Sequence, residues 1–193
     1  MYNIEKGGNM SKNTKQVLAA SLFRILEKKP LDKIRISDLT EDCNVNRQTF
    51  YYHFHDIYGL IEWIYVSQAQ KAIGSHKTYG SWETGMKDLC DLMLKQKTFL
   101  MKTYHSASHG NLEKVLTDSA RSLIYDVVKE KAVGYDITDE SCQFIADFYK
   151  YSFAGIVLNW IERGMTISSD ELVGYIAKIM HGNLEDAIRK FAK

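Results

Sequence analysis

The chain contains a single proline, Pro30, among its 193 residues, and it contains few runs of β-branched residues. Because proline interrupts helices and β-branched runs favour strands, this pattern favours an all-α fold. Leu18, Leu22 and Ile25 have the spacing of one buried helical face. We expect helices over residues 13–28, 47–54, 82–96, 99–107, 112–131, 139–163 and 169–191, one more after Asp56, and a loop over 74–80.

Between residues 36 and 54, local signals predict two short helices joined by a tight turn. Ser37 is a favourable N-cap, with Asp38 in the positively polarised first turn. Asn44 tolerates the left-handed backbone conformation that such a turn requires. Asn46 is a favourable cap for the second helix. Two short helices joined in this way form a helix-turn-helix.

The overall charge is nearly balanced, with 25 basic and 24 acidic side chains. A net charge of +1 neither favours nor excludes nucleic acid, so a DNA-binding surface would need a local concentration of positive charge. Residues 11–55 carry eight basic and five acidic side chains, which is only a small excess. Charge alone therefore leaves the partner undecided.

Several classes of protein and site are disfavoured by what the sequence lacks. The three cysteines are dispersed without C-x-x-C spacing, which indicates reduced thiols rather than a disulfide framework or a zinc site. His105 and His109 have i, i+4 spacing but no evident carboxylate or cysteine partner, so we expect neither a metal nor a cofactor. No G-x-S-x-G, phosphate-loop or H-E-x-x-H motif indicates an enzyme.

The sequence also predicts location and domain organisation. No apolar run approaches the roughly 20 residues of a membrane span, and the first ten residues do not resemble a signal peptide. We therefore expect a cytoplasmic protein without membrane contact. We expect a flexible leader over residues 1–10, a helix-turn-helix domain over 11–57 and a helical domain for effector binding and dimerisation over 58–193.

The segment ISDLTEDCNVNRQTFYYHFHDIYGL, residues 36–60, resembles the DNA-binding signature of the TetR/AcrR family of regulators. The resemblance covers residues 13–65, where the first helix fits by pattern and the run TFYYHF fits by identity. It implies an N-terminal three-helix helix-turn-helix domain that binds double-stranded DNA. It also implies a C-terminal helical bundle that binds an effector and forms a homodimer.

The resemblance places the DNA contacts on and around the second short helix. An aromatic run at helical spacing is usually core, and Phe50 and Phe54 should be buried whatever the function. Because neighbours on a helix point about 100° apart, at least one adjacent tyrosine must face outward. Arginine has the donor geometry for guanine, glutamine that for adenine, and hydroxyls suit phosphate. The predicted DNA-binding residues are Ser37, Arg47, Gln48, Thr49, Tyr51, Tyr52, His53 and His55.

One departure from the family pattern concerns the grip on the DNA backbone. Members commonly carry a basic residue directly after the position of Phe54 and a lysine that opens the next helix. Here those places hold His55 and Ile57, with Asp56 between them. Positive charge is therefore missing where phosphate should approach, unless His55 carries a proton.

The long helix before the last one carries the candidate dimer surface. Its small residues Ala154 and Gly155 permit close helix contact, although a helix buried within one chain fits the pattern equally well. The family resemblance favours dimerisation through Tyr151, Ala154, Gly155, Leu158, Leu172, Ile176 and Ile179. The spacing of Phe153, Gly155, Trp160 and Gly164 resembles a subgroup described as dihydroxyacetone kinase regulators.

A ligand cavity, if the bundle holds one, would be lined by aromatic side chains. The candidates are Trp63, Trp82, Phe99, Tyr104, Phe144 and Phe148. Each is also an ordinary core candidate, because aromatic side chains dominate protein cores. Both interpretations stay open on the sequence alone.

Two functions follow from these features. The first is a ligand-responsive repressor that binds a near-palindromic operator as a dimer, with recognition helices about 34 Å apart. The alternative is a TetR-like co-regulator or activator subunit controlled by a partner protein rather than by a small molecule. The missing lysine and the lack of a convincing polar pocket motivate this alternative.

Overall fold

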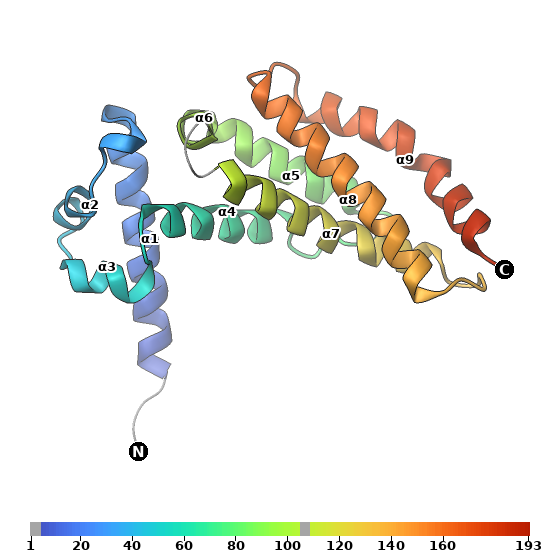
Figure 1. Cartoon of the computed structure of the whole chain (residues 1–193), viewed down its shortest axis with the longest axis horizontal. Helices are drawn as coiled ribbons and strands as arrows, with labels where there is room; N and C mark the ends of the chain where they lie inside the picture. Colours follow the sequence, from blue (N-terminus) through green and yellow to red (C-terminus); the bar gives the residue numbers. More distant parts are fainter. Residues whose placement is uncertain (1–4, 105–108) are drawn as a thin grey trace. The chain divides into compact units, whose positions relative to one another are not determined.

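The computed structural model describes residues 5–104 and 109–193, and this part of the chain consists of helices without strands (Figure 1). The all-α prediction is confirmed. The predicted helix end at residue 107, like His105, lies outside the described residues. The elements are α1 Glu5–Lys28, a 3-10 turn Leu31–Lys33, α2 Ile36–Asp42, α3 Arg47–His53, α4 Ile57–Ile73, α5 Trp82–Lys95, α6 Lys97–Tyr104, α7 His109–Lys131, α8 Asp139–Glu162 and α9 Ser169–Phe191.

The chain divides into two compact units. The N-terminal unit comprises Met1–Tyr65 and Lys97–Gly110, and the C-terminal unit comprises Val66–Gln96 and Asn111–Lys193. The N-terminal unit thus extends past the boundary predicted at residue 57 and includes α6, which packs against α1. No helix in the described ranges combines the length and the apolarity needed to cross a bilayer.

α1 presents a continuous apolar face to the core of the N-terminal unit. Leu18, Leu22 and Leu26 on this face are almost completely buried, and α1 packs against both α2 and α6. The helix ends just before Pro30, as predicted, because proline lacks a backbone N–H and cannot continue the hydrogen-bond ladder. It begins at Glu5, so the described part of the predicted leader is helical.

The connection between α2 and α3 follows most of the local signals in the sequence. Asn44 adopts the left-handed conformation, with φ 51°. The Asn46 side chain accepts a hydrogen bond of 2.7 Å from a backbone N–H in the first turn of α3. The prediction for Ser37 was wrong: the N-cap of α2 is Arg35, whose backbone N–H donates to Asp38 Oδ2 at 2.8 Å. The carboxylate of the third helical residue thus binds the N–H of the N-cap residue, and Ser37 lies inside the first turn.

The C-terminal unit is built mainly from α5, α7, α8 and α9. α9 packs against α5 and α8, and the long α8 and α9 are visible in orange and red in Figure 1. Trp82, Ile124 and Ile161 are fully buried in its core. Thr138 caps α8 and Ser168 caps α9.

Candidate nucleic-acid interface

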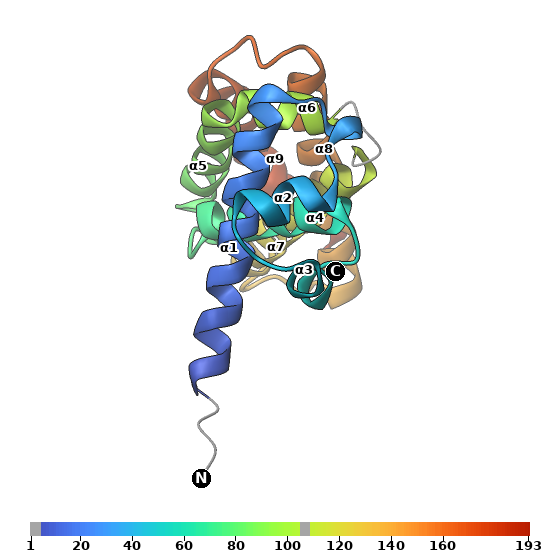
Figure 2. The ribbon, with the colours of Figure 1, turned by 90° about the vertical axis from the view of Figure 1, so that its left-hand side faces the viewer.

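α3 is a seven-residue helix whose two sides differ in character. On one side Phe50 is fully buried and Phe54, the C-cap residue, is 7% exposed, with their ring centroids 5.8 Å apart. On the other side Arg47 and Gln48, in the first turn, are exposed. Figure 2 shows α3 following α2 across the short connection of the helix-turn-helix. The polar first turn of α3 is therefore available to a partner.

The two tyrosines of α3 also face outward. Tyr51 is 57% exposed and Tyr52 is 82% exposed, whereas the sequence required only one of them to do so. The Tyr52 ring lies edge-on to that of His53, with centroids 5.0 Å apart. Within the described residues, no carboxylate forms an ion pair with Arg47. This face thus combines one uncompensated positive charge with two accessible phenols.

Two predicted phosphate ligands are placed less favourably. The Thr49 hydroxyl donates its proton to Asn46 Oδ1 at 3.0 Å as part of the cap of α3. The hydroxyl therefore cannot donate the same proton to a phosphate oxygen. Ser37 is half-buried in the first turn of α2, where its carbonyl accepts from the Thr40 hydroxyl at 3.2 Å. The structure places Ser37 in the helix rather than at its cap.

The junction between α3 and α4 carries little positive charge. Burial, and then the nearby Lys15, lower the pKa of His53, so this ring is neutral at pH 7. The fully solvated His55 ring lies 3.3 Å from Asp56 Oδ2. Asp56 Oδ1 in turn accepts from the backbone N–H of Gly59 at 2.8 Å, and this hydrogen bond lowers the pKa of Asp56 below its usual value. An ionised carboxylate therefore stands between the two places where the family pattern has basic groups.

One basic residue at this junction was missed by the sequence analysis. Lys15 Nζ, on α1, lies 5.5 Å from the ring centroid of Phe54 and 5.8 Å from that of Trp63. No ion pair joins Lys15 to a carboxylate of the described residues. Its only sequence signal is its place three residues before the buried Leu18, which sets its stem beside the apolar face of α1.

Two other basic side chains of the N-terminal unit are already paired with carboxylates. Arg24 Nη2 lies 2.5 Å from Asp42 Oδ2, and Lys29 Nζ lies 2.6 Å from Asp38 Oδ2. Hydrogen bonds from these cations are the main reason that the pKa values of both carboxyl groups fall below the usual range. These ion pairs neutralise the charges of Arg24 and Lys29, so the small excess of basic residues in the sequence is not distributed over the whole unit.

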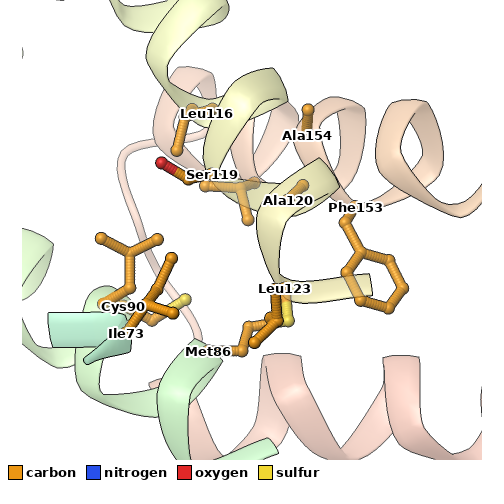
Figure 3. Close-up of a pocket in the computed structure, with 11 residues that line it drawn as sticks. Ile73, Met86, Cys90, Leu116, Ser119, Ala120, Leu123, Phe153 and Ala154 are labelled. Carbon is orange, nitrogen blue, oxygen red and sulfur yellow. The ribbon is translucent and has the colours of Figure 1, made fainter. Parts of the chain in front are cut away.

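A cavity lies within the C-terminal unit between the end of α4 and helices α5, α7 and α8 (Figure 3). Its volume of about 20 Å³ leaves room for about one water molecule. Ser119 supplies the only hydroxyl, and burial raises the pKa of the Cys90 thiol to about 12, so the thiol is neutral. The lining residues are Ile73, Met86, Leu89, Cys90, Leu116, Ser119, Ala120, Leu123, Phe153, Ala154 and Val157.

None of the six aromatic residues predicted for a ligand site lines this cavity. Phe144 and Phe148 are each 63% exposed, because they lie on the outer side of α8. Trp82 is fully buried and packs on Phe153 with centroids 5.5 Å apart, one layer behind the lining. The other three belong to the N-terminal unit, where two are buried and one is half-buried: Phe99, Tyr104 and Trp63.

The sequence contains only an indirect signal for the residues that line the cavity, namely their helical spacing. Met86, Leu89 and Cys90 on α5, and Leu116 and Ala120 on α7, have the i, i+3, i+4 spacing of inward-facing stripes. This spacing identifies a buried face but does not show where packing leaves a space. The aromatic criterion used on the sequence did not select Phe153, the aromatic side chain that does line the cavity.

The predicted dimer residues separate into two groups. Ala154, Leu172 and Ile176 are 3–4% exposed, because they face the interior of the bundle in a single chain, and this part of the prediction is corrected. Tyr151 and Ile179 are 65% and 62% exposed. Gly155 is exposed and Leu158 is half-buried, and the apolar outer face of α8 and α9 also includes Phe144, Phe148 and Tyr175. We call this set the outer face.

Known proteins resemble the chain over nearly its whole length. The HTH-type dhaKLM operon transcriptional activator DhaS of Lactococcus lactis subsp. lactis (strain IL1403) is 23% identical over 163 residues, which are 82% of this chain and 86% of that protein. A solved structure of the dihydroxyacetone kinase operon activator DhaS has a TM-score of 0.70 and 21% identity, covering 93% of this chain and 98% of its own.

A second solved structure, a TetR transcriptional regulator from Streptococcus agalactiae 2603V, has a TM-score of 0.57 and 14% identity over 99% of this chain and 100% of its own. A family model described as the C-terminal region of transcriptional regulators of the TetR type matches residues 80–182. These relatives are regulators and not enzymes. With a helix-turn-helix before the matched bundle, the chain belongs to the TetR family of transcriptional regulators.

Proposed function

We propose that this chain binds double-stranded DNA as a homodimer and regulates transcription through the exposed face of α3. The observation that carries the proposal is the two-sided character of α3, whose exposed first turn holds Arg47 and Gln48 while Phe50 and Phe54 anchor its back. A recognition helix needs this combination, because its first turn enters the major groove while its back stays on the domain.

The proposed contacts follow from the donors that the face offers. Arg47 has a free guanidinium that can bond guanine O6 and N7 together, and Gln48 can bond adenine N6 and N7. Tyr51 and Tyr52 extend phenols towards phosphate or towards a thymine methyl group. Ser37, His53 and His55 are further proposed contacts to the backbone, whereas Thr49 acts as part of the cap.

The outer face supports a homodimer. Phe144, Phe148, Tyr151, Gly155 and Leu158 recur every three or four residues, which places them along one side of α8. Large apolar side chains in a contiguous exposed stripe mark interaction surfaces in folded proteins. A two-fold dimer built on this face would present two copies of α3 to a near-palindromic operator, with half-sites about 34 Å apart.

Fluorescence anisotropy with duplexes that tile the DNA upstream of the gene tests the proposal. We expect one duplex to bind more tightly than a scrambled duplex. Arg47→Ala or Gln48→Ala should reduce this discrimination by about 1–3 kcal/mol per base pair read. Arg121→Ala, which removes an exposed arginine from α7, should leave it unchanged. Unchanged discrimination in both α3 variants would refute the proposed docking.

The direction of regulation is a further part of the proposal. We infer that the chain regulates the transcription of neighbouring genes. The relative from Lactococcus lactis is named an operon activator, which favours activation over the repression expected from the sequence. A transcriptional reporter joined to the upstream DNA decides between them. Loss of reporter signal on deletion of the gene indicates an activator, and a gain indicates a repressor.

A second candidate, control by a partner protein, is favoured by the small cavity. A typical effector pocket has a volume of about 300–1,000 Å³, whereas this cavity has about 20 Å³ and no charged group. A small-molecule effector would have to open the bundle, whereas a protein could bind an exposed surface without doing so. DNA binding or activation that appears only when a purified partner is added would support this candidate, and full activity of the isolated protein would exclude it.

A further inference from the structure

The region where α3 ends and α4 begins is poor in positive charge, although the proposed docking brings it close to the DNA backbone. α3 has seven residues and is about 10 Å long. The major groove is about 12 Å wide, so a helix that enters it with its first turn ends near the phosphates at the groove edge. His53 is neutral, His55 is held beside a carboxylate, and α4 opens with Ile57.

Lys15 brings a positive charge to this place from another helix. Its ammonium lies over the rings of Phe54 and Trp63, at 5.5 and 5.8 Å from their centroids. It is also close enough to His53 to help lower the pKa of that ring. The group thus stands next to the last residue of α3, although it is distant in sequence.

The environment of Lys15 holds the ammonium in place without neutralising it. Aromatic faces attract a cation by their quadrupole and leave its net charge and its N–H donors available. Arg24 and Lys29 in the same unit are fixed differently, since each has a carboxylate partner. Lys15 has none among the described residues.

We propose that Lys15 is a phosphate ligand of the DNA complex and replaces the cation that α4 lacks. In this role the rings of Phe54 and Trp63 hold the ammonium beside the C-terminal end of α3, and one N–H of the ammonium bonds a phosphate oxygen at the groove edge. The contact carries no sequence information, so it strengthens binding to every duplex alike. This inference rests on the proposed DNA binding through α3.

The salt dependence of DNA binding is the decisive measurement, because it counts neutralised phosphates. For a fluorescein-labelled duplex of random sequence, the slope of log K against log salt should fall in magnitude by about 0.9 per lost contact, thus by about 1.8 for a dimer of Lys15→Met chains. The binding curves of variant and wild type should converge towards about 1 M salt, where counterion release no longer contributes. The methionine keeps an apolar stem against the rings.

Three companion variants separate charge from packing. Lys15→Arg should keep the wild-type slope, because a guanidinium also stacks on aromatic rings and bonds phosphate. Lys28→Gln removes a charge from the other end of α1 and should leave the slope unchanged. Ile57→Lys in the Lys15→Met chain should restore the slope by returning a cation to the start of α4. Circular dichroism verifies that each variant retains its helices.

The outcomes distinguish this inference from the function on which it rests. An unchanged slope in a folded Lys15→Met protein overturns the phosphate contact while leaving DNA binding intact. Equal weakening by Lys15→Met and Lys15→Arg, without a change of slope, assigns Lys15 a purely structural role and also overturns it. If wild-type protein binds no duplex at any salt concentration, both the proposed function and this inference are wrong.

Discussion

The two units of this protein use short and long helices for different purposes. In the N-terminal unit, only α1 is long, whereas α2 and α3 have seven residues each, and their ends are set by nearby side chains such as Asn46 and Asp38. In the C-terminal unit, α7 and α8 have 23 and 24 residues and α9 spans 23 with a kink at His181 and Gly182, and their faces are decided by what packs against them. Local chemistry therefore shapes the candidate DNA surface, whereas distant contacts shape the bundle.

The units also differ in how they use charge. In the C-terminal unit, ion pairs join helices: Lys87 on α5 pairs with Asp170 on α9 at 3.4 Å, and Lys129 on α7 pairs with Asp139 on α8 at 2.9 Å. In the N-terminal unit, Arg24 and Lys29 likewise pair with carboxylates of α2, whereas Lys15 and Arg47 have no such partner among the described residues. Charge thus stabilises the bundle internally, whereas part of the charge on the helix-turn-helix remains for a ligand.

The largest expected effect comes from removing the anchor of α3. Phe50→Ala should cost about 3–5 kcal/mol of unfolding free energy, because the ring is fully buried. Hydrogen exchange measured by mass spectrometry should show the loss in α2 and α3, together with loss of DNA binding. Ile161→Ala, a matched core truncation in α8, should instead weaken protection in the bundle. Identical patterns for the two variants would refute the division into two units.

A change on the outer face should act on assembly rather than on folding. Phe148→Glu would place an unpaired charge in the proposed dimer interface, at a cost of about 3 kcal/mol, which weakens the dimer more than hundredfold. Sedimentation velocity should then show monomers at concentrations where the wild type is dimeric. Val133→Glu makes the same type of change at a residue that is 80% exposed and lies outside α8 and α9. A dimer that survives Phe148→Glu would contradict the assigned surface.

The caps of the two units offer a smaller and closely matched test. Asn46→Ala and Thr138→Ala each remove a side-chain acceptor from the start of a helix, at a cost of about 1 kcal/mol. Because α3 is short, the Asn46 variant should lose DNA affinity as well as stability. The long α8 should tolerate loss of its cap without a change in DNA affinity. Anisotropy titrations of both variants compare them directly, and equal affinities would show that α3 does not need its cap.

The smallest effect concerns acid. The pKa of Asp38 is lowered in the folded state, mainly by the hydrogen bond from Lys29, so the carboxylate contributes stability above its unfolded pKa of 3.8. This contribution is lost as the pH falls through the lower folded value. In Asp38→Asn, the melting temperature should therefore depend less on pH below about 4 than in the wild type. Thermal melts between neutral pH and strongly acidic pH measure this, and parallel curves would contradict the assignment.

Much of the helix-turn-helix was predictable because its signals are local. Pro30, Asn44 and Asn46 act through their own backbone or through residues three positions away, and the structure has each where the sequence placed it. Ser37 was misplaced as a cap because α2 begins at Ile36, one residue before Ser37, where the Arg35 N–H donates to the Asp38 carboxylate. The predictions for individual DNA contacts remain to be tested.

The sequence by itself determined the helices, most of their ends and the two-sided pattern of α3, since periodicity and capping need only neighbours along the chain. Only the tertiary structure decided which apolar residues became surface. Ala154 and Phe148 both belong to the apolar pattern of α8, yet one lines the cavity and the other is exposed. The same holds for Lys15, which reaches the end of α3 because α1 and Phe54 meet in space. Such pairings depend on contacts between residues far apart in the chain, which no local pattern encodes.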